Sequence, residues 1–282
     1  MSFSHVMRHD FPEEVPRPGS LAALRERIRH IEQPASHGVL PFGVAAIDRV
    51  LPDGGLALGA VHEILGIDGD EEDGAAACGF IAGLLARLRM GPVLWCLKRP
   101  DLYGPGLLAH GLDPARLVIV TAPRDEDILW AIEEGLRAPG LVAVIGEIGR
   151  LPLVAGRRLQ LAAERSGITA FLLRRWRNSE EAARERERPS AAVTRWRIAA
   201  LPARDIDDPK LRQLIGQPRW RVELLRCRGG VPAQWVVESG DVEVADATGH
   251  VRLSPELADR PAAAADRKEG RLAAEPLQRR TG

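Results

Sequence analysis

The sequence lacks the segments that carry a chain into or across a membrane. No apolar run follows a basic start at the N-terminus, which argues against a signal peptide. No stretch approaches the ~18 uncharged apolar residues that a membrane-spanning helix requires. We therefore predict a cytoplasmic protein without a membrane partner.

Cysteine is scarce, and a net charge is absent. The three cysteines, Cys78, Cys96 and Cys227, have no metal-ligand spacing, and their odd number favours buried thiols in a reducing compartment. Lys+Arg and Asp+Glu both total 39, so the overall charge indicates no particular partner. The sequence predicts neither a metal site nor another cofactor.

What the sequence does contain is an alternation of apolar strands with helices. Its 282 residues can form one large α/β domain with extensions. Continuous apolar runs separated by helical segments are typical of a parallel sheet with helices on both faces. Two later segments alternate polar and apolar residues, as antiparallel edge strands do. The expected strands are 60–65, 92–97, 116–120, 141–145, 169–173, 193–201 and 219–228, and the expected helices are 75–89, 105–111, 126–137 and 156–166.

Three regions are expected along the chain. Residues 1–40 form a tail and one helix, residues 41–239 form the core, and residues 240–282 form a largely disordered tail that lacks apolar periodicity. The N-terminal helix, residues 21–32, has one apolar stripe, which predicts packing on this chain or on a partner. The candidate interface residues are Leu21, Leu24, Ile28 and Ile31.

The turn after the first buried strand is where an ATPase of this architecture has its phosphate-binding loop. That loop, GxxxxGK[ST], needs a Lys against the phosphate charge and a Ser/Thr hydroxyl for Mg²⁺. Here Gly66 and Gly74 bound a stretched turn, and Ala75 and Ala76 stand where Lys and Ser/Thr belong. The carboxylates within 68–73 would repel a triphosphate. Their spacing does not fit a calcium loop either, so we interpret them as a solvated acidic turn.

His62 and Glu63 fall inside the first buried strand. They do not form a zinc motif, because no second histidine follows at the required spacing. We interpret His62 as a packed strand-end residue near the former nucleotide site.

The residues around the stretched turn resemble those of RecA recombinases, which implies a RecA-like fold. In RecA the strand that corresponds to 141–147 ends in the Walker B Asp, whereas Gly146 stands here, followed by Glu147. The catalytic Glu expected after 92–97 is also missing, because Lys98 follows. The resemblance before the turn is carried by Pro41-Phe42-Gly43, Ile47-Asp48, Gly54-Gly55-Leu56, Gly59 and Glu63-Ile64.

The segment 174–197 is rich in arginine and contains Trp176 and Trp196. In a RecA-like topology the second DNA-binding loop leaves the sheet here, and guanidinium groups beside an indole suit single-stranded DNA. The alternative is a solvated helix in which Glu180 and Arg184 pair at i,i+4. The candidate DNA contacts are Arg177, Arg184, Arg186 and Arg188.

Longer strings resemble the ImuA family, the RecA-like mutagenesis proteins of bacterial SOS cassettes. The most specific are GLDPARL at 111–117 and RRLQLAAERSG at 157–167, and the resemblance covers roughly residues 20–261. It implies a non-catalytic accessory protein of damage-induced translesion synthesis. Such a protein would be an adaptor for the polymerase-like ImuB and an error-prone DnaE-type polymerase, with RecA as a further candidate partner. Two alternatives stay open, a cell-division inhibitor of the SulA type and an active DNA-dependent ATPase.

Overall fold

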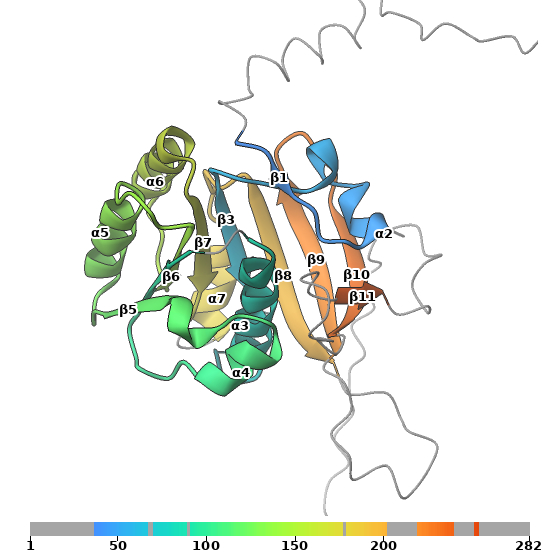
Figure 1. The fold of residues 1–282 in the computed structure, drawn as a ribbon, viewed down its shortest axis with the longest axis horizontal. Helices are drawn as coiled ribbons and strands as arrows, with labels where there is room; N and C mark the ends of the chain where they lie inside the picture. The colour runs from blue at the N-terminus through green and yellow to red at the C-terminus, as the bar shows by residue number, and fades with distance from the viewer. Residues whose placement is uncertain are drawn as a thin grey trace, which may run out of the picture.

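A computed structural model of the protein describes residues 37–66, 70–88, 91–176, 179–201, 219–239 and 251–253. The strands are β1 (Val39–Leu40), β2 (Leu56–Ala57), β3 (Val61–Leu65), β4 (Val93–Leu97), β5 (Leu117–Thr121), β6 (Ala143–Ile148), β7 (Thr169–Arg174), β8 (Thr194–Leu201), β9 (Arg219–Cys227), β10 (Ala233–Ser239) and β11 (Val251–Leu253). Nine of them form one sheet in the order β11-β10-β9-β8-β3-β7-β6-β4-β5 (Figure 1). Six neighbouring strands are parallel, namely β8, β3, β7, β6, β4 and β5. The strands β9, β10 and β11 extend the sheet antiparallel. The short strands β1 and β2 pair separately.

Helices cover both faces of this sheet. The α-helices are α2 (Ala45–Asp48), α3 (Asp70–Arg87), α4 (Gly104–Ala109), α5 (Asp125–Gly135), α6 (Leu153–Ser166) and α7 (Ser179–Arg186). One hydrophobic core includes the buried residues of α3 and α4, and a second core on the opposite face includes those of α5 and α6. Ala182 of α7 packs against Leu65 and Trp176 on this second face. The expected α/β architecture, parallel with antiparallel edge strands, is confirmed.

The alternation of side chains along each strand assigns its residues to one face or the other. In β3, Ile64 belongs to the core under α3, whereas Val61 belongs to the core under α5 and α6. Because all five residues of β3 are buried, His62 and Glu63 must find polar partners inside the protein. These partners define the site described below.

The observed boundaries differ from the expected ones in two places that matter. The helix after β3 begins at Asp70, so residues 70–73 belong to its first turn and are not part of a solvated loop. The reason is electrostatic, because acidic residues are favoured at the positive end of the helix dipole. The strand β11 lies within 240–282, where only a tail was expected; the sequence missed it because three residues are too few to show a period.

Some expectations fall on residues outside the described ones. These are the N-terminal helix with its candidate interface residues, and most of the C-terminal tail.

The helix α6 shows how the string RRLQLAAERSG folds. It ends at Gly167, whose φ of 76° is the left-handed conformation that favours glycine at a helix C-terminus.

Candidate functional site

The carboxyl ends of β3 and β7 meet at a small hollow beside the start of α3. Its volume is about 10 Å³, room for a single water molecule. The hollow lies at the place where the sequence predicted a former nucleotide site. Its lining residues are Gly66, Gly74, Ala77, Leu173, Arg174, Arg175 and Trp176.

The two alanines that follow Gly74 carry no group that could bind phosphate or a metal. Ala75 is exposed, and Ala76 is buried in the core under α3. Because both positions belong to α3, the helix here presents methyl groups in place of an ammonium and a hydroxyl. Arginines reach the hollow instead, from the end of β7.

At the end of β6, Gly146 and Glu147 point to opposite faces of the sheet. A Cβ atom at Gly146 would collide with the Ile132 side chain of α5, so a carboxylate at this position would require Ile132 to move. Glu147 points to the α3 face, where Trp95 Nε1 donates a hydrogen bond of 2.9 Å to its carboxylate. The carboxylate on the α3 face therefore belongs to Glu147.

Arg175 neutralises this buried carboxylate. Its Nη1 lies 2.7 Å from Glu147 Oε2, and its Nη2 lies 2.9 Å from Asp101 Oδ2. Burial raises the pKa of Glu147, and the charge of Arg175 and the hydrogen bonds from Arg175 and Trp95 oppose that rise. Arg175 is thus bound on both sides by carboxylates of its own chain.

Lys98 stands after β4, where the RecA resemblance places a catalytic Glu. Its Nζ lies 2.5 Å from Asp125 Oδ1. The same Asp125 carboxylate accepts hydrogen bonds of 3.0 Å from the backbone N–H groups of Gly149 and Arg150. Lys98 therefore helps to fix the loop after β6.

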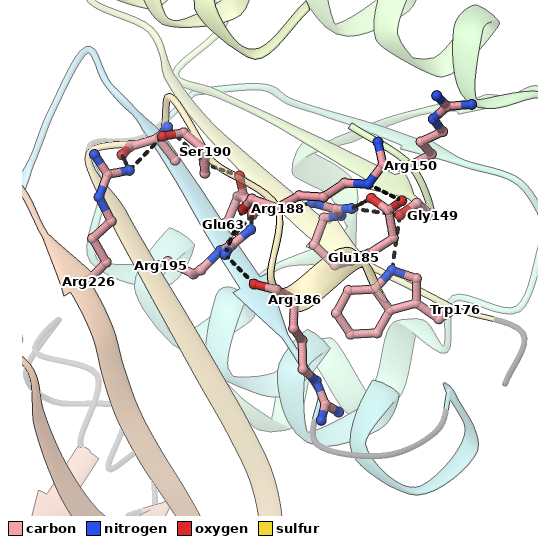
Figure 2. A network of polar contacts seen from close by, with 12 residues as sticks. Glu63, Gly149, Arg150, Trp176, Glu185, Arg186, Arg188, Ser190, Arg195 and Arg226 are labelled. Atoms are coloured by element: carbon pink, nitrogen blue, oxygen red, sulfur yellow. Dashed lines mark hydrogen bonds and ion pairs between the residues drawn. The ribbon is translucent and has the colours of Figure 1, made fainter. Parts of the chain in front are cut away.

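A second polar network lies on the opposite face and is centred on Glu63 (Figure 2). The Glu63 carboxylate, completely buried, lies 3.3 Å from Arg174 Nη1 and 3.0 Å from Arg195 Nη2. It also accepts a hydrogen bond from the hydroxyl of Ser190. Arg174 in turn lies 3.0 Å from Glu185 Oε2 of α7. Two guanidinium groups and a hydroxyl thus surround one carboxylate.

This network fixes α7 and the chain after it to the sheet. Arg195 Nη1 donates to the backbone oxygens of Arg186, at 2.8 Å, and Arg188, at 3.3 Å. The Arg186 guanidinium lies over the Trp176 ring, 5.7 Å from its centroid. Figure 2 shows the Arg195 side chain between Glu63 and the backbone of Arg186.

The candidate DNA contacts are consequently not equivalent. Arg184 is exposed, and its Nε donates to the backbone oxygen of Glu180 instead of pairing with the Glu180 carboxylate. Arg188, about half exposed, pairs with Glu185 at 2.9 Å. Arg186 lies against Trp176, and Arg177 falls outside the described residues.

His62 has a structural role away from the hollow, so its predicted position near the former nucleotide site is wrong. Its Nε2 donates to Ala57 O at 2.8 Å, and its Nδ1 accepts from the Thr194 hydroxyl at 2.7 Å. Trp196 Nε1 donates to the same hydroxyl at 2.7 Å, which fixes the direction of this relay. Burial lowers the pKa of His62 to about 4.

The sequence reasoning missed the Glu63 network. Glu63 lies within the mostly apolar strand AVHEIL, and Arg174 directly follows the apolar run AFLL, and a charge at such a position signals a buried partner. The identity of the partner could not be predicted, because Glu63 and Arg195 are 132 residues apart in sequence.

Two further features are absent from the described part of the chain. No three His, Cys, Asp or Glu residues come together there as metal ligands, and none of its helices is long and apolar enough to cross a membrane. All three cysteines are described, and none forms a disulfide; Cys96 and Cys227 are buried and Cys78 is half-buried.

Comparison with known proteins identifies the family. No protein-family profile matches the chain. Two curated proteins, both called Protein ImuA, from Caulobacter vibrioides strains NA1000 and ATCC 19089, are each 40% identical to it over 237 residues. The aligned region covers 81% of this chain and 93% of each relative. The chain belongs to the ImuA family. The resemblance to ImuA in the sequence strings is thereby confirmed, and nearly the whole length of these ImuA proteins has a counterpart here.

Proposed function

We propose that this ImuA-family chain is a non-catalytic accessory protein of SOS-induced, error-prone translesion DNA synthesis. It acts as an adaptor in a complex with the polymerase-like ImuB and an error-prone DnaE-type polymerase, and RecA is a further partner. Its RecA-like nucleotide site is degenerate and its work needs no cofactor. It acts in the cytoplasm, where the DNA is.

The small volume of the hollow beside α3 supports the non-catalytic part of this proposal. Small-molecule sites are clefts of about 300–1,000 Å³, and the hollow has about 10 Å³. Arg175 is no substitute for a phosphate-binding Lys, because Asp101 and Glu147 already compensate its charge. A triphosphate would have to displace these carboxylates and open the packing around Trp176.

The test is ATP hydrolysis and binding of a fluorescent ATP analogue by the purified protein, with and without single-stranded DNA. We expect background values in both assays. The double variant Ala75→Lys, Ala76→Thr restores the missing groups while leaving the hollow closed, and we expect it to be inactive as well. Wild-type turnover that follows the folded protein through purification and disappears in Gly74→Val would favour the DNA-dependent ATPase instead.

The adaptor role is tested separately, by isolating the tagged chain from DNA-damaged cells. We expect ImuB and the DnaE-type polymerase in the isolated complex, and we expect each to bind the purified chain directly. Recovery of the division-ring protein without a polymerase would favour the SulA-type alternative. For DNA, the exposed Arg184 and the half-exposed Arg188 are the described candidates that a phosphate could reach.

A further inference from the structure

The outer side of the helices α5 and α6 carries large apolar side chains that the protein does not cover. Trp130 of α5 is 65% exposed, and Val154 and Leu161 of α6 are 70% and 52% exposed. Trp130 is also unusual among the six tryptophans, because the other five are each less than a tenth exposed. The two helices lie side by side on the same face of the sheet (Figure 1).

The three apolar side chains belong to one continuous surface. Glu133 of α5 forms an ion pair with Arg158 of α6, which fixes how the two helices are aligned. Trp130 lies one turn before Glu133 on α5, and Val154 lies one turn before Arg158 on α6. Leu161 lies one turn after Arg158, so all three are on the same side of their helices as the ion pair. We call Trp130, Val154, Leu161 and the arginines between them the α5–α6 surface.

Two arginines that have no partner among the described residues flank these apolar residues. Arg157 and Arg165 are exposed, and neither has a hydrogen bond or ion pair with another described residue. They lie about 12 Å apart along α6, with Leu161 between them. By contrast, the cations of α5 are paired, since Arg137 binds Glu133 and Glu134. The chain has no net charge, so the two unpaired cations are a local feature of α6.

We propose that the α5–α6 surface docks an acidic amphipathic helix of a partner protein. The apolar face of that helix would cover Trp130, Val154 and Leu161, and its carboxylates would pair with Arg157 and Arg165. Arg157 and Arg165 select acidic residues opposite α6, whereas the exposed Glu126, one turn before Trp130 on α5, excludes them there. Trp130 beside arginines also suits single-stranded DNA, but Val154 and Leu161 favour a protein, because the apolar face of a helix gives them side chains to pack on. This inference does not rest on the proposed function, since it uses only the chemistry of the surface.

The exposed Trp130 provides a direct readout. Acrylamide quenches exposed tryptophans, so the quenchable fluorescence of the whole protein comes from Trp130, and Trp130→Phe should remove it. The probe is a synthetic helical peptide with a leucine stripe flanked by glutamates. We expect this peptide to protect Trp130 from quenching, and we expect the same peptide with lysines in place of the glutamates to protect it at least tenfold less well.

Reversing the charge of the two arginines is a second test of the proposal. Arg157→Glu and Arg165→Glu should each weaken binding of the acidic peptide about tenfold, and the double variant should bind the lysine peptide instead. The matched control is Arg221→Glu, which reverses an exposed arginine of β9 and should leave binding unchanged. Because all three positions are exposed, the variants should stay folded.

Three results would overturn the proposal. One is failure of the acidic peptide to protect Trp130 at any soluble concentration. Another is peptide binding that is equal in the wild type and in the double variant. The third is protection of Trp130 by single-stranded oligothymidylate that is lost in Arg157→Glu, which would make the surface a nucleic-acid site. None of these results bears on ATP turnover or on the polymerase partners, so the proposed function is tested independently.

Discussion

His62 and Glu63 are neighbours in β3, both are completely buried, and they point to opposite faces of the sheet. His62 is kept neutral: one hydroxyl and one backbone oxygen satisfy its ring, and no counter-ion approaches it among the described contacts. Glu63 instead lies between two arginines. One strand therefore contains both ways of burying a titratable group, as a neutral hydrogen-bonding residue and as a compensated charge.

A difference in depth separates the two arginines that follow one another at the end of β7, each of which is compensated by two carboxylates. Arg174 binds Glu63 and Glu185 inside the protein, with 2% of its side chain exposed. Arg175 binds Glu147 and Asp101 closer to the surface, with 19% exposed. The deeper network fixes α7 to the sheet, and the shallower one closes the hollow beside α3. Both networks contribute to stability, and the deeper one is expected to contribute more.

The largest effect is expected from Arg174→Met. This change leaves Glu63 with one cation and Glu185 without its buried partner, and breaking a buried pair in this way costs about 3–5 kcal/mol. Urea unfolding at neutral pH, followed by circular dichroism, measures the loss of unfolding free energy.

The matched control for that variant is Arg188→Met. Arg188 pairs with the same Glu185, but its side chain is 46% exposed, so the expected loss is below about 1 kcal/mol. Equal losses in the two variants would mean that burial does not distinguish the two networks.

The sequence predicted features that depend on neighbouring residues, and it did not predict contacts between residues far apart in the chain. Runs such as VLWCL in β4 and AFLL within β7 are apolar throughout, so local pattern was enough to predict parallel strands covered on both faces. Alternation likewise predicted β8 and β9, whereas β10 and β11 were not predicted. By contrast, the start of α3 was predicted too late, because an acidic cluster resembles a loop unless the helix dipole is taken into account.

The site was predicted only in part, for a related reason. The absent Lys and Ser/Thr at Ala75 and Ala76 could be read directly, since they are substitutions in a known pattern. The side chains that close the hollow could not, because Arg175 meets Glu147 and Asp101 only after β4, β6 and β7 assemble. For the same reason, the sequence places Gly146 and Glu147 at the end of this strand but does not show that only Glu147 points to the α3 face, because that direction depends on strand pleating.

A loss of stability in acid, about 3 kcal/mol, is expected from His62. Its pKa is about 4 in the folded protein and 6.5 when unfolded, so the unfolded chain binds the proton more tightly. The stabilising contribution is therefore complete above pH 6.5 and is lost as the pH falls from 6.5 towards 4. Unfolding free energies of the wild type and of His62→Gln, measured across this range, should differ by a pH-dependent amount. A constant difference would show that His62 does not titrate in this way.

A smaller effect, about 2 kcal/mol at pH 7, is expected from Arg175→Gln, because the variant removes a charged hydrogen bond from a buried carboxylate. Burial already raises the pKa of Glu147 above its ordinary 4.5, and loss of the cation raises it further. With a raised pKa, the stability that comes from protonating Glu147 is complete below pH 4.5 and is lost as the pH rises through the folded-state pKa. Arg175→Gln should therefore be more destabilised at pH 7 than at pH 5, in the opposite sense to His62. Urea unfolding at these two pH values decides the matter, since an equal loss at both would mean that Glu147 stays charged without Arg175.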